Sequence, residues 1–174
     1  GGTIATNYRT DVALVGDARL GLQALVLAVQ QRLGQRPTHT ADGRALAATA
    51  RREKAAFFEP LAASTEQPIK PERVVSLLNE LLPPRAIVVA DPGTPCPYLS
   101  AYFNAPQAGR HFITNRAHGA LGYALSAGFG AAIGQPDAMV VAVMGDGSFG
   151  FTCGELETIV RRNVPLKMIV FSNA

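Results

Sequence analysis

Short, uninterrupted apolar runs alternate with longer segments of helical periodicity from residue 71 to the end of the chain. Strands that are apolar at every position are typical of a parallel sheet covered on both faces. Such runs predict buried strands at residues 86–90, 139–144 and 166–171, and a shorter strand at 111–114. Helices are expected over residues 72–82, with Pro71 at the first position, and over 97–103, 119–133 and 151–162. The pattern predicts an α/β fold with a doubly wound parallel sheet.

A different pattern precedes residue 71. Residues 11–15 are a short apolar run that predicts a strand, and apolar residues from Leu22 to Leu33 then recur at helical spacing after Asp17, which is placed as an N-cap. We expect residues 1–35 to end a domain that begins before residue 1, in a chain of which this sequence is a fragment. Prolines interrupt residues 36–70, although an Ala/Arg-rich stretch at 44–58 predicts a helix. This segment is therefore expected to be an interdomain linker.

Polar or flexible residues follow three of the predicted strands, at 91–94, 145–148 and 172–173. In an open parallel α/β sheet, ligands bind outside the carboxyl ends of the strands. Gly145-Asp146-Gly147-Ser148 leads into a helix, where glycines allow a ligand to approach the backbone and free amides favour an anion. The Asp146 carboxylate would repel a phosphate unless a hard cation bridged the two, and magnesium prefers such oxygen ligands. With an amide oxygen from Asn173, the residues predict a magnesium-bridged phosphate site.

Each part of this pattern also has a plainer explanation. Gly-Asp-Gly is a common turn, and an Asn after a strand is usually a turn residue or a cap. The full series is much less common than any one of its parts. It runs from a buried strand through Gly-Asp-Gly-Ser, a helix and a second buried strand to Asn173. Residues 128–134 are glycine-rich like a dinucleotide fingerprint, but they lie within a predicted helix, so close helix packing explains them better.

These motifs resemble those of thiamine-diphosphate-dependent enzymes, in particular the acetolactate synthase and benzoylformate decarboxylase group. The magnesium and diphosphate motif of that family opens with Gly-Asp-Gly and closes with Asn-Asn, and residues 145–173 are similar to it. Further similar segments are 69–75 at the entry to the diphosphate-binding domain, 86–93 at its first strand and phosphate loop, 119–134 at its glycine-rich helix, and 15–18 at the end of the central domain. The resemblance implies that residues 71–174 are a diphosphate-binding domain, incomplete at its C-terminus, and that residues 1–35 end a central domain.

The resemblance also implies thiamine diphosphate and Mg²⁺ as cofactors. Asp146 and Asn173 would be the side-chain ligands of the magnesium ion. Leu121 would be the large apolar residue that holds the cofactor in the bent form in which it can deprotonate itself. The implied cofactor-binding residues are Gly93, Thr94, Leu121, Gly145, Asp146, Gly147, Ser148 and Asn173. Such an enzyme, a lyase or transferase, would decarboxylate a 2-keto acid or related carbonyl compound, or join it to an acceptor.

Three features depart from the family pattern. Ser172 replaces the first Asn of the closing pair, which should be tolerated because the second Asn binds the metal. Pro95 stands where acetolactate synthases usually carry a His near the cofactor, which weakens an assignment to that activity. The glutamate that protonates the pyrimidine ring belongs to a first domain, on a partner subunit, that this sequence lacks. We therefore expect the fragment alone to be inactive, and the active site to form between subunits of a homodimer or homotetramer.

Two more residues lie close in sequence to the predicted site. His118, directly before Gly119, could face the substrate and transfer a proton, although a hydrogen-bonded loop histidine is the commoner role. If His118 acts in this way, its replacement by Ala should lower turnover and leave cofactor binding intact. Cys96 follows the phosphate loop and is most simply a small buried side chain.

Composition limits the other classes of function. The net charge is +3, and no basic stripe with interleaved aromatic residues points to nucleic acid. No apolar run reaches the roughly 18 residues of a membrane span, no secretory signal is visible, and the cysteines lack metal spacing. We expect a cytoplasmic protein that acts on a small molecule and binds neither nucleic acid nor membrane. Two alternatives stay open: another magnesium- and phosphate-binding α/β domain, and a catalytically silent homologue.

Overall fold

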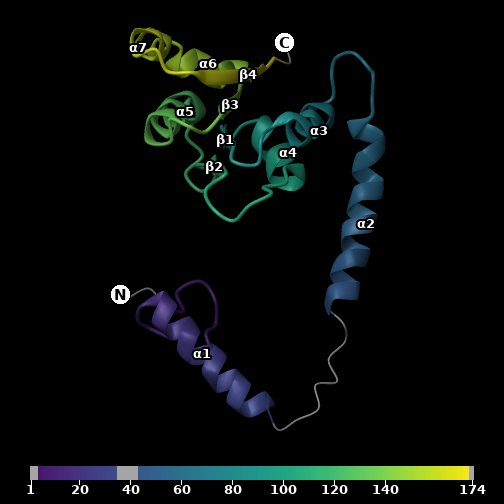
Figure 1. The fold of residues 1–174 in the computed structure, drawn as a ribbon, viewed down its shortest axis with the longest axis vertical. Helices are drawn as coiled ribbons and strands as arrows, with labels where there is room; N and C mark the ends of the chain where they lie inside the picture. Colours follow the sequence, from purple (N-terminus) through teal and green to yellow (C-terminus); the bar gives the residue numbers. More distant parts are fainter. Residues whose placement is uncertain (1–3, 35–42, 173–174) are drawn as a thin grey trace. The chain divides into compact units, whose positions relative to one another are not determined.

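The computed structural model describes residues 4–34 and 43–172. The chain divides into two compact units, residues 1–49 and 50–174, and each is described by itself. Figure 1 shows the helices and strands of both units, coloured along the chain. No helix in the described ranges is both long enough and apolar enough to cross a membrane. The domain and linker boundaries expected at residues 35 and 70 stay predictions.

Helix α1 (Ala18–Leu33) is the main element of the first unit. Asp17 caps it as predicted, because the Leu20 backbone N–H donates to Asp17 Oδ1 over 2.9 Å. Residues 11–15 do not form the predicted strand. A strand needs a neighbour to accept and donate its backbone hydrogen bonds, and the described part of this unit contains no second strand.

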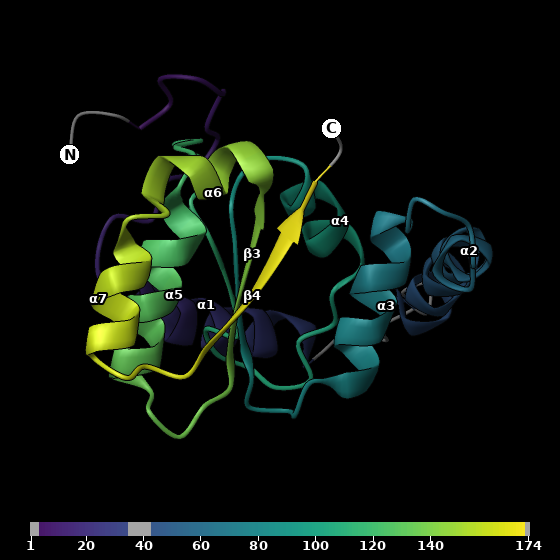
Figure 2. The same cartoon turned by 90° about the horizontal axis from the view of Figure 1, so that it is seen from above.

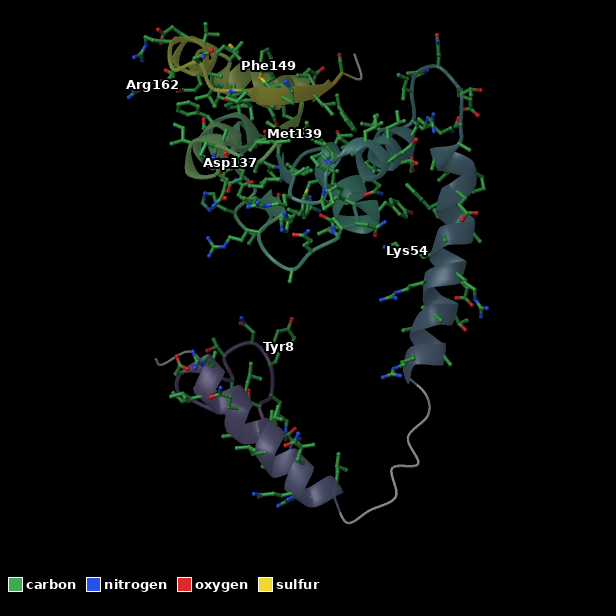
Figure 3. The ribbon with its side chains drawn as sticks, viewed as in Figure 1. Tyr8, Lys54, Asp137, Met139, Phe149 and Arg162 are labelled. Carbon is green, nitrogen blue, oxygen red and sulfur yellow. The ribbon has the colours of Figure 1, made fainter. Side chains whose placement is uncertain are left out.

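Helix α2 (Gly43–Ala62) confirms the helix predicted at residues 44–58 and extends it past Pro60. Its C-terminal half belongs to the second unit, where it contacts helix α4 (Pro95–Tyr102). The Phe58 and Tyr102 rings stack with their centroids 4.2 Å apart. Lys54, labelled in Figure 3, donates to the Ala101 carbonyl, and its ammonium lies 5.3 Å from the centroid of the Tyr102 ring. The predicted linker thus contains a helix that is attached to the second unit.

The second unit is built on a four-stranded sheet with the order β2-β1-β3-β4. Its strands are β1 (Ile87–Ala90), β2 (Phe112–Thr114), β3 (Val140–Gly145) and β4 (Leu166–Phe171). All three pairings are parallel, and Val88 of β1 lies between Phe112 of β2 and Val141 of β3. The predicted parallel sheet is confirmed. Since every strand runs the same way, the carboxyl ends of all four meet at one end of the sheet.

Helices cover both faces of this sheet. Helices α3 (Pro71–Leu81) and α4 lie on one side, and α5 (Tyr123–Gly134) and α7 (Glu155–Arg161) lie on the other (Figure 2). One apolar cluster joins Val75 of α3 and Leu99 of α4 to Val88 and Val141. The second cluster joins Leu125 of α5 and Ile159 of α7 to alternate residues of the strands, and Phe149, labelled in Figure 3, packs against it. Burial on both faces therefore explains the apolar strands β1 and β3. The prediction of a buried strand at 166–171 is wrong, because β4 is an edge strand of the sheet and none of its residues is buried.

Two predicted helices have different limits in the structure. The helix expected from Gly119 begins only at Tyr123, because Gly119 and Gly122 have positive φ angles of 77° and 83° and form a turn instead. The helix expected at 151–162 is two helices, α6 (Asp146–Thr152) and α7, that are separated at Cys153 and Gly154. The first of them begins inside the Gly-Asp-Gly segment, so Asp146 is a helical residue at the end of β3.

The close packing predicted for the glycine-rich segment of α5 is found at Gly128 but not at Gly130 or Gly134, and a matched pair of substitutions tests it. A Cβ on Gly128 would lie 3.1 Å from Ala142 Cβ and 3.2 Å from Leu166 Cδ1, whereas one on Gly130 would have no atom within 4 Å. We expect Gly128→Ala to lower the free energy of unfolding by about 1–3 kcal/mol through overpacking, offset in part by its helix propensity. Gly130→Ala should raise it by about 0.5–1 kcal/mol. Urea unfolding of both variants measures the difference, and equal effects would contradict the packing role.

Candidate functional site

The polar segments that follow β1, β3 and β4 lie at one end of the sheet. Helix α6, the tip of β4 and the start of α4 are found together at that end in Figure 2. They bring residues 91–94, 145–148 and 172 to the carboxyl edge, as the sequence predicted. The carboxyl edge of an open α/β sheet is where such folds bind ligands.

Asp146 connects the ends of β3 and β4. Its Oδ2 atom accepts a hydrogen bond from Ser172 Oγ over 3.3 Å, and its Oδ1 atom accepts one from the Gly147 backbone N–H over 2.7 Å. The Asp146 side chain is exposed, and no ion pair to it is present among the described residues. An unneutralised carboxylate beside a hydroxyl oxygen is the kind of ligand set that a hard divalent cation takes.

Asn173, the second predicted ligand of the metal, lies outside the described residues. In the described ranges, no group of three or more His, Cys, Asp or Glu residues is placed to hold a metal ion. A magnesium ion at Asp146 would therefore take its other ligands from neutral protein oxygens, from phosphate or from water, which is usual for this ion.

Gly93, Leu121 and Ser148 come together from three different segments. A Cβ on Gly93 would lie 3.7 Å from Leu121 Cδ2 and 4.0 Å from Ser148 Oγ. Ser148 is buried, whereas Leu121 is 46% exposed and presents an apolar side chain at the open side of the site. Thr94 follows Gly93 as the residue before α4. These four predicted residues are thus neighbours at the carboxyl edge.

The backbone where β3 ends and α6 begins is open to an approaching ligand. A Cβ on Gly147 would have no atom within 4 Å, and one on Gly145 would meet only the Phe171 carbonyl oxygen at 3.9 Å. The absence of side chains there leaves a path for a bulky anion to reach the backbone N–H groups. Together with the Asp146 carboxylate, this open backbone fits a diphosphate bridged to the protein by a cation.

The sequence places Asp91 directly after a predicted strand but does not show which groups it binds. Asp91 is fully buried, and its Oδ1 and Oδ2 atoms accept hydrogen bonds from the backbone N–H groups of Tyr123 over 3.0 Å and Ala124 over 3.1 Å. Burial raises the pKa of the Asp91 carboxyl above its ordinary value, and the hydrogen bonds from the α5 backbone partly counter that rise. An acid directly after a fully buried strand is the signal that could have predicted a nearby set of donors.

Gly122 links the start of α5 to the end of α6. Its carbonyl oxygen accepts a hydrogen bond from Thr152 Oγ1 over 3.2 Å. A Cβ at this position would lie 2.9 Å from Thr152 Cγ2 and 3.0 Å from Phe151 Cβ. The turn before α5 is therefore in tight contact with α6, the helix that carries Asp146.

The loop between β2 and α5 carries His118 and Arg116. The His118 side chain is exposed, and its backbone N–H donates to the Asn115 carbonyl over 2.9 Å. Arg116 Nη1 donates to the Pro92 carbonyl over 2.9 Å and so attaches this loop to the segment that follows β1. A role for His118 in proton transfer stays a prediction.

Pro95 and Cys96 open helix α4 and are both buried. Cys96 Sγ lies 3.5 Å from Thr114 Oγ1 and 3.6 Å from Ser100 Oγ, and the thiol is free. The prediction of a small buried side chain at Cys96 is confirmed.

This chain is similar in sequence to known proteins. The family described as "Thiamine pyrophosphate enzyme, C-terminal TPP binding domain" matches residues 91–174. A protein of Pseudomonas aeruginosa named a probable 2-ketoarginine decarboxylase is 34% identical over 167 residues, which are 95% of this chain and 28% of that protein. The acetolactate synthase of Arabidopsis thaliana chloroplasts is 27% identical over 170 residues, which are 98% of this chain and 25% of the synthase.

The chain is also similar to a solved structure. The structure titled "X-ray structure of a putative thiamin diphosphate-dependent enzyme isolated from Mycobacterium smegmatis" matches with a TM-score of 0.52 and 26% identity. The match covers 57% of this chain and 20% of that one. The chain therefore spans less than a third of the length of each of these proteins.

Proposed function

Over residues 91–174 this chain belongs to the C-terminal TPP-binding domain family of thiamine pyrophosphate enzymes, and from this premise we propose that it is part of an enzyme that uses thiamine diphosphate and Mg²⁺ on a 2-keto acid or a related carbonyl compound. The observation that carries the proposal is the contact between Asp146 and Ser172 at the ends of β3 and β4. It leaves an exposed carboxylate beside an open glycine backbone, which suits a metal-bridged diphosphate.

Each part of the site has a role in this proposal. Asp146 holds the magnesium ion, with Asn173 as the second side-chain ligand. Gly93 and Thr94 on one side, and Gly145, Gly147 and Ser148 on the other, provide the surface on which the diphosphate lies. Leu121, half-exposed beside Gly93, would support the apolar part of the cofactor. When bound, thiamine diphosphate supplies the carbon nucleophile and the electron sink for cleavage or formation of a bond next to a carbonyl.

The reaction is proposed only as decarboxylation, carboligation or both. The relatives named above include a synthase and a decarboxylase, so similarity alone does not choose between them. Pro95 weakens the case for acetolactate synthesis itself. We further propose a homodimer or homotetramer in which the partner subunit completes the active site.

Calorimetric titration of the complete protein tests the cofactor. Thiamine diphosphate should bind in the presence of Mg²⁺ and lose most of its affinity when EDTA replaces the metal, because Asp146 would then face the diphosphate without a cation between them. ATP with Mg²⁺ is the matched control and should not bind. Binding of ATP in preference would favour a different phosphate-binding domain, whereas cofactor binding without turnover of any 2-keto acid would favour a catalytically silent homologue.

A further inference from the structure

Asp91 is a buried acid without a part in the proposed site. It follows β1 directly, and its carboxylate binds the first two amides of α5. The first amides of a helix have no acceptor within the helix, and a buried carboxylate is costly unless its oxygens receive hydrogen bonds. Each group thus satisfies the other, in a place that water does not reach.

We propose that Asp91 is a positioning residue of the diphosphate site. By binding the amides of Tyr123 and Ala124, it holds Leu121 against residues 91–94, the phosphate loop that follows β1. The proposal rests on the proposed function, since it gives Asp91 a task at the site of the cofactor.

Short chain segments transmit this restraint. Gly93 lies two residues after Asp91, and Leu121 lies two residues before Tyr123. Leu121 Cδ2 reaches within 3.7 Å of the position of a Cβ on Gly93. Because Gly93 lies only two residues from Asp91, and Leu121 only two from Tyr123, a shift of α5 relative to Asp91 moves Leu121 away from Gly93. The distance between the phosphate loop and the apolar support of the cofactor is therefore set at Asp91.

A second connection between the same segments is weaker. Arg116 donates to the Pro92 carbonyl, but the arginine is exposed and water competes for both groups. Asp91 is fully buried, so breaking its hydrogen bonds leaves polar groups without partners. Of these two connections, the one made by Asp91 should have the larger effect on the position of Leu121 when it is removed.

Asp91 also determines where a bound anion can lie. The amides that open α5 would by themselves attract a phosphate. Here they already bind an internal carboxylate, whose charge would repel a second anion. The diphosphate must therefore take its backbone donors from the segments after β1 and β3.

Hydrogen exchange of the cofactor-free protein tests the proposal directly. Asp91→Asn keeps one acceptor oxygen but turns an NH₂ group toward the second amide donor. We expect amide exchange at Tyr123 and Ala124 to rise at least about tenfold, with a parallel rise at Gly93 and Thr94. Asp137→Asn is the matched control, because Asp137 is an exposed acid near the opposite end of the sheet. Faster exchange at 123 and 124 alone, or at none of these residues, would overturn the proposal.

Cofactor affinity supplies a second readout. With Mg²⁺ present, and at a temperature where circular dichroism shows Asp91→Asn to be folded, its Kd for thiamine diphosphate should rise about tenfold or more. An unchanged Kd beside a wild type that binds would overturn the positioning role alone. Failure of the wild type to bind would contradict the proposed function and leave the exchange result to decide the role of Asp91.

The wild type gives a measurement that does not depend on the variant folding. Adding thiamine diphosphate and Mg²⁺ should slow exchange at Tyr123 and Ala124 together with Gly93 and Thr94, because the two segments act as one. Slower exchange confined to Gly93 and Thr94 would overturn the proposal.

Discussion

Replacing Asp146 with alanine should abolish the magnesium-dependent binding of thiamine diphosphate. Asp146 is the side chain of the described site that offers a carboxylate to a cation, and its loss leaves Ser172 and the glycine backbone, which are neutral. Removing a group that only supports a metal ligand costs about 10–100-fold in affinity, so removing a ligand should cost at least about 100-fold. Calorimetric titration of the cofactor in the presence of Mg²⁺ measures this loss.

The loss of binding can be separated from a loss of folding. Asp146 is exposed, so Asp146→Ala should change the free energy of unfolding by about 0.5 kcal/mol or less. Asp137→Ala provides the matched control, because it removes an exposed acid from the turn before β3, whereas Asp146 follows the same strand. Wild-type affinity in Asp146→Ala would refute the proposed metal site, and an equal loss in both variants would point to a general effect of charge.

Replacing Gly122 with alanine should destabilise the second unit by about 2–5 kcal/mol. The φ angle of 83° costs a residue with a Cβ about 1–2 kcal/mol. The new Cβ would also lie 2.9 Å from Thr152 Cγ2 and 3.0 Å from Phe151 Cβ, and such overpacking adds about 1–3 kcal/mol. Urea unfolding followed by circular dichroism measures the change.

Gly119→Ala separates the two causes. Gly119 has a similar φ angle of 77°, but a Cβ there would have no atom within 4 Å. Its replacement should therefore lower the free energy of unfolding only by the cost of the positive φ angle, about 1–2 kcal/mol. If Gly122→Ala is no more destabilising than Gly119→Ala, the contact between the start of α5 and the end of α6 is looser than described.

The strands of the second unit could be predicted because their signal is local. The apolar run at 139–144 is visible without knowledge of its neighbours, and β3 covers Val140–Gly145 in the structure. The alternation of runs and helices also predicted a parallel sheet, which places the residues after β1, β3 and β4 at one edge. The contact between Asp146 and Ser172 follows from that topology. The strand predicted at residues 11–15 does not form, because an apolar run does not show whether a neighbouring strand is present to pair with it.

By itself, then, the sequence determined the strands of the second unit and which polar residues stand at their ends, since both depend on the order of apolar and polar positions. Only the tertiary structure decided where α5 begins and what Asp91 binds. Asp91 meets Tyr123 and Ala124 across 32 and 33 residues of chain, and Gly122 meets Thr152 across 30. Periodicity reports only on near neighbours along the chain. The hydrogen bonds that fix the geometry of the site join distant segments, and they exist only once the sheet has brought those segments together.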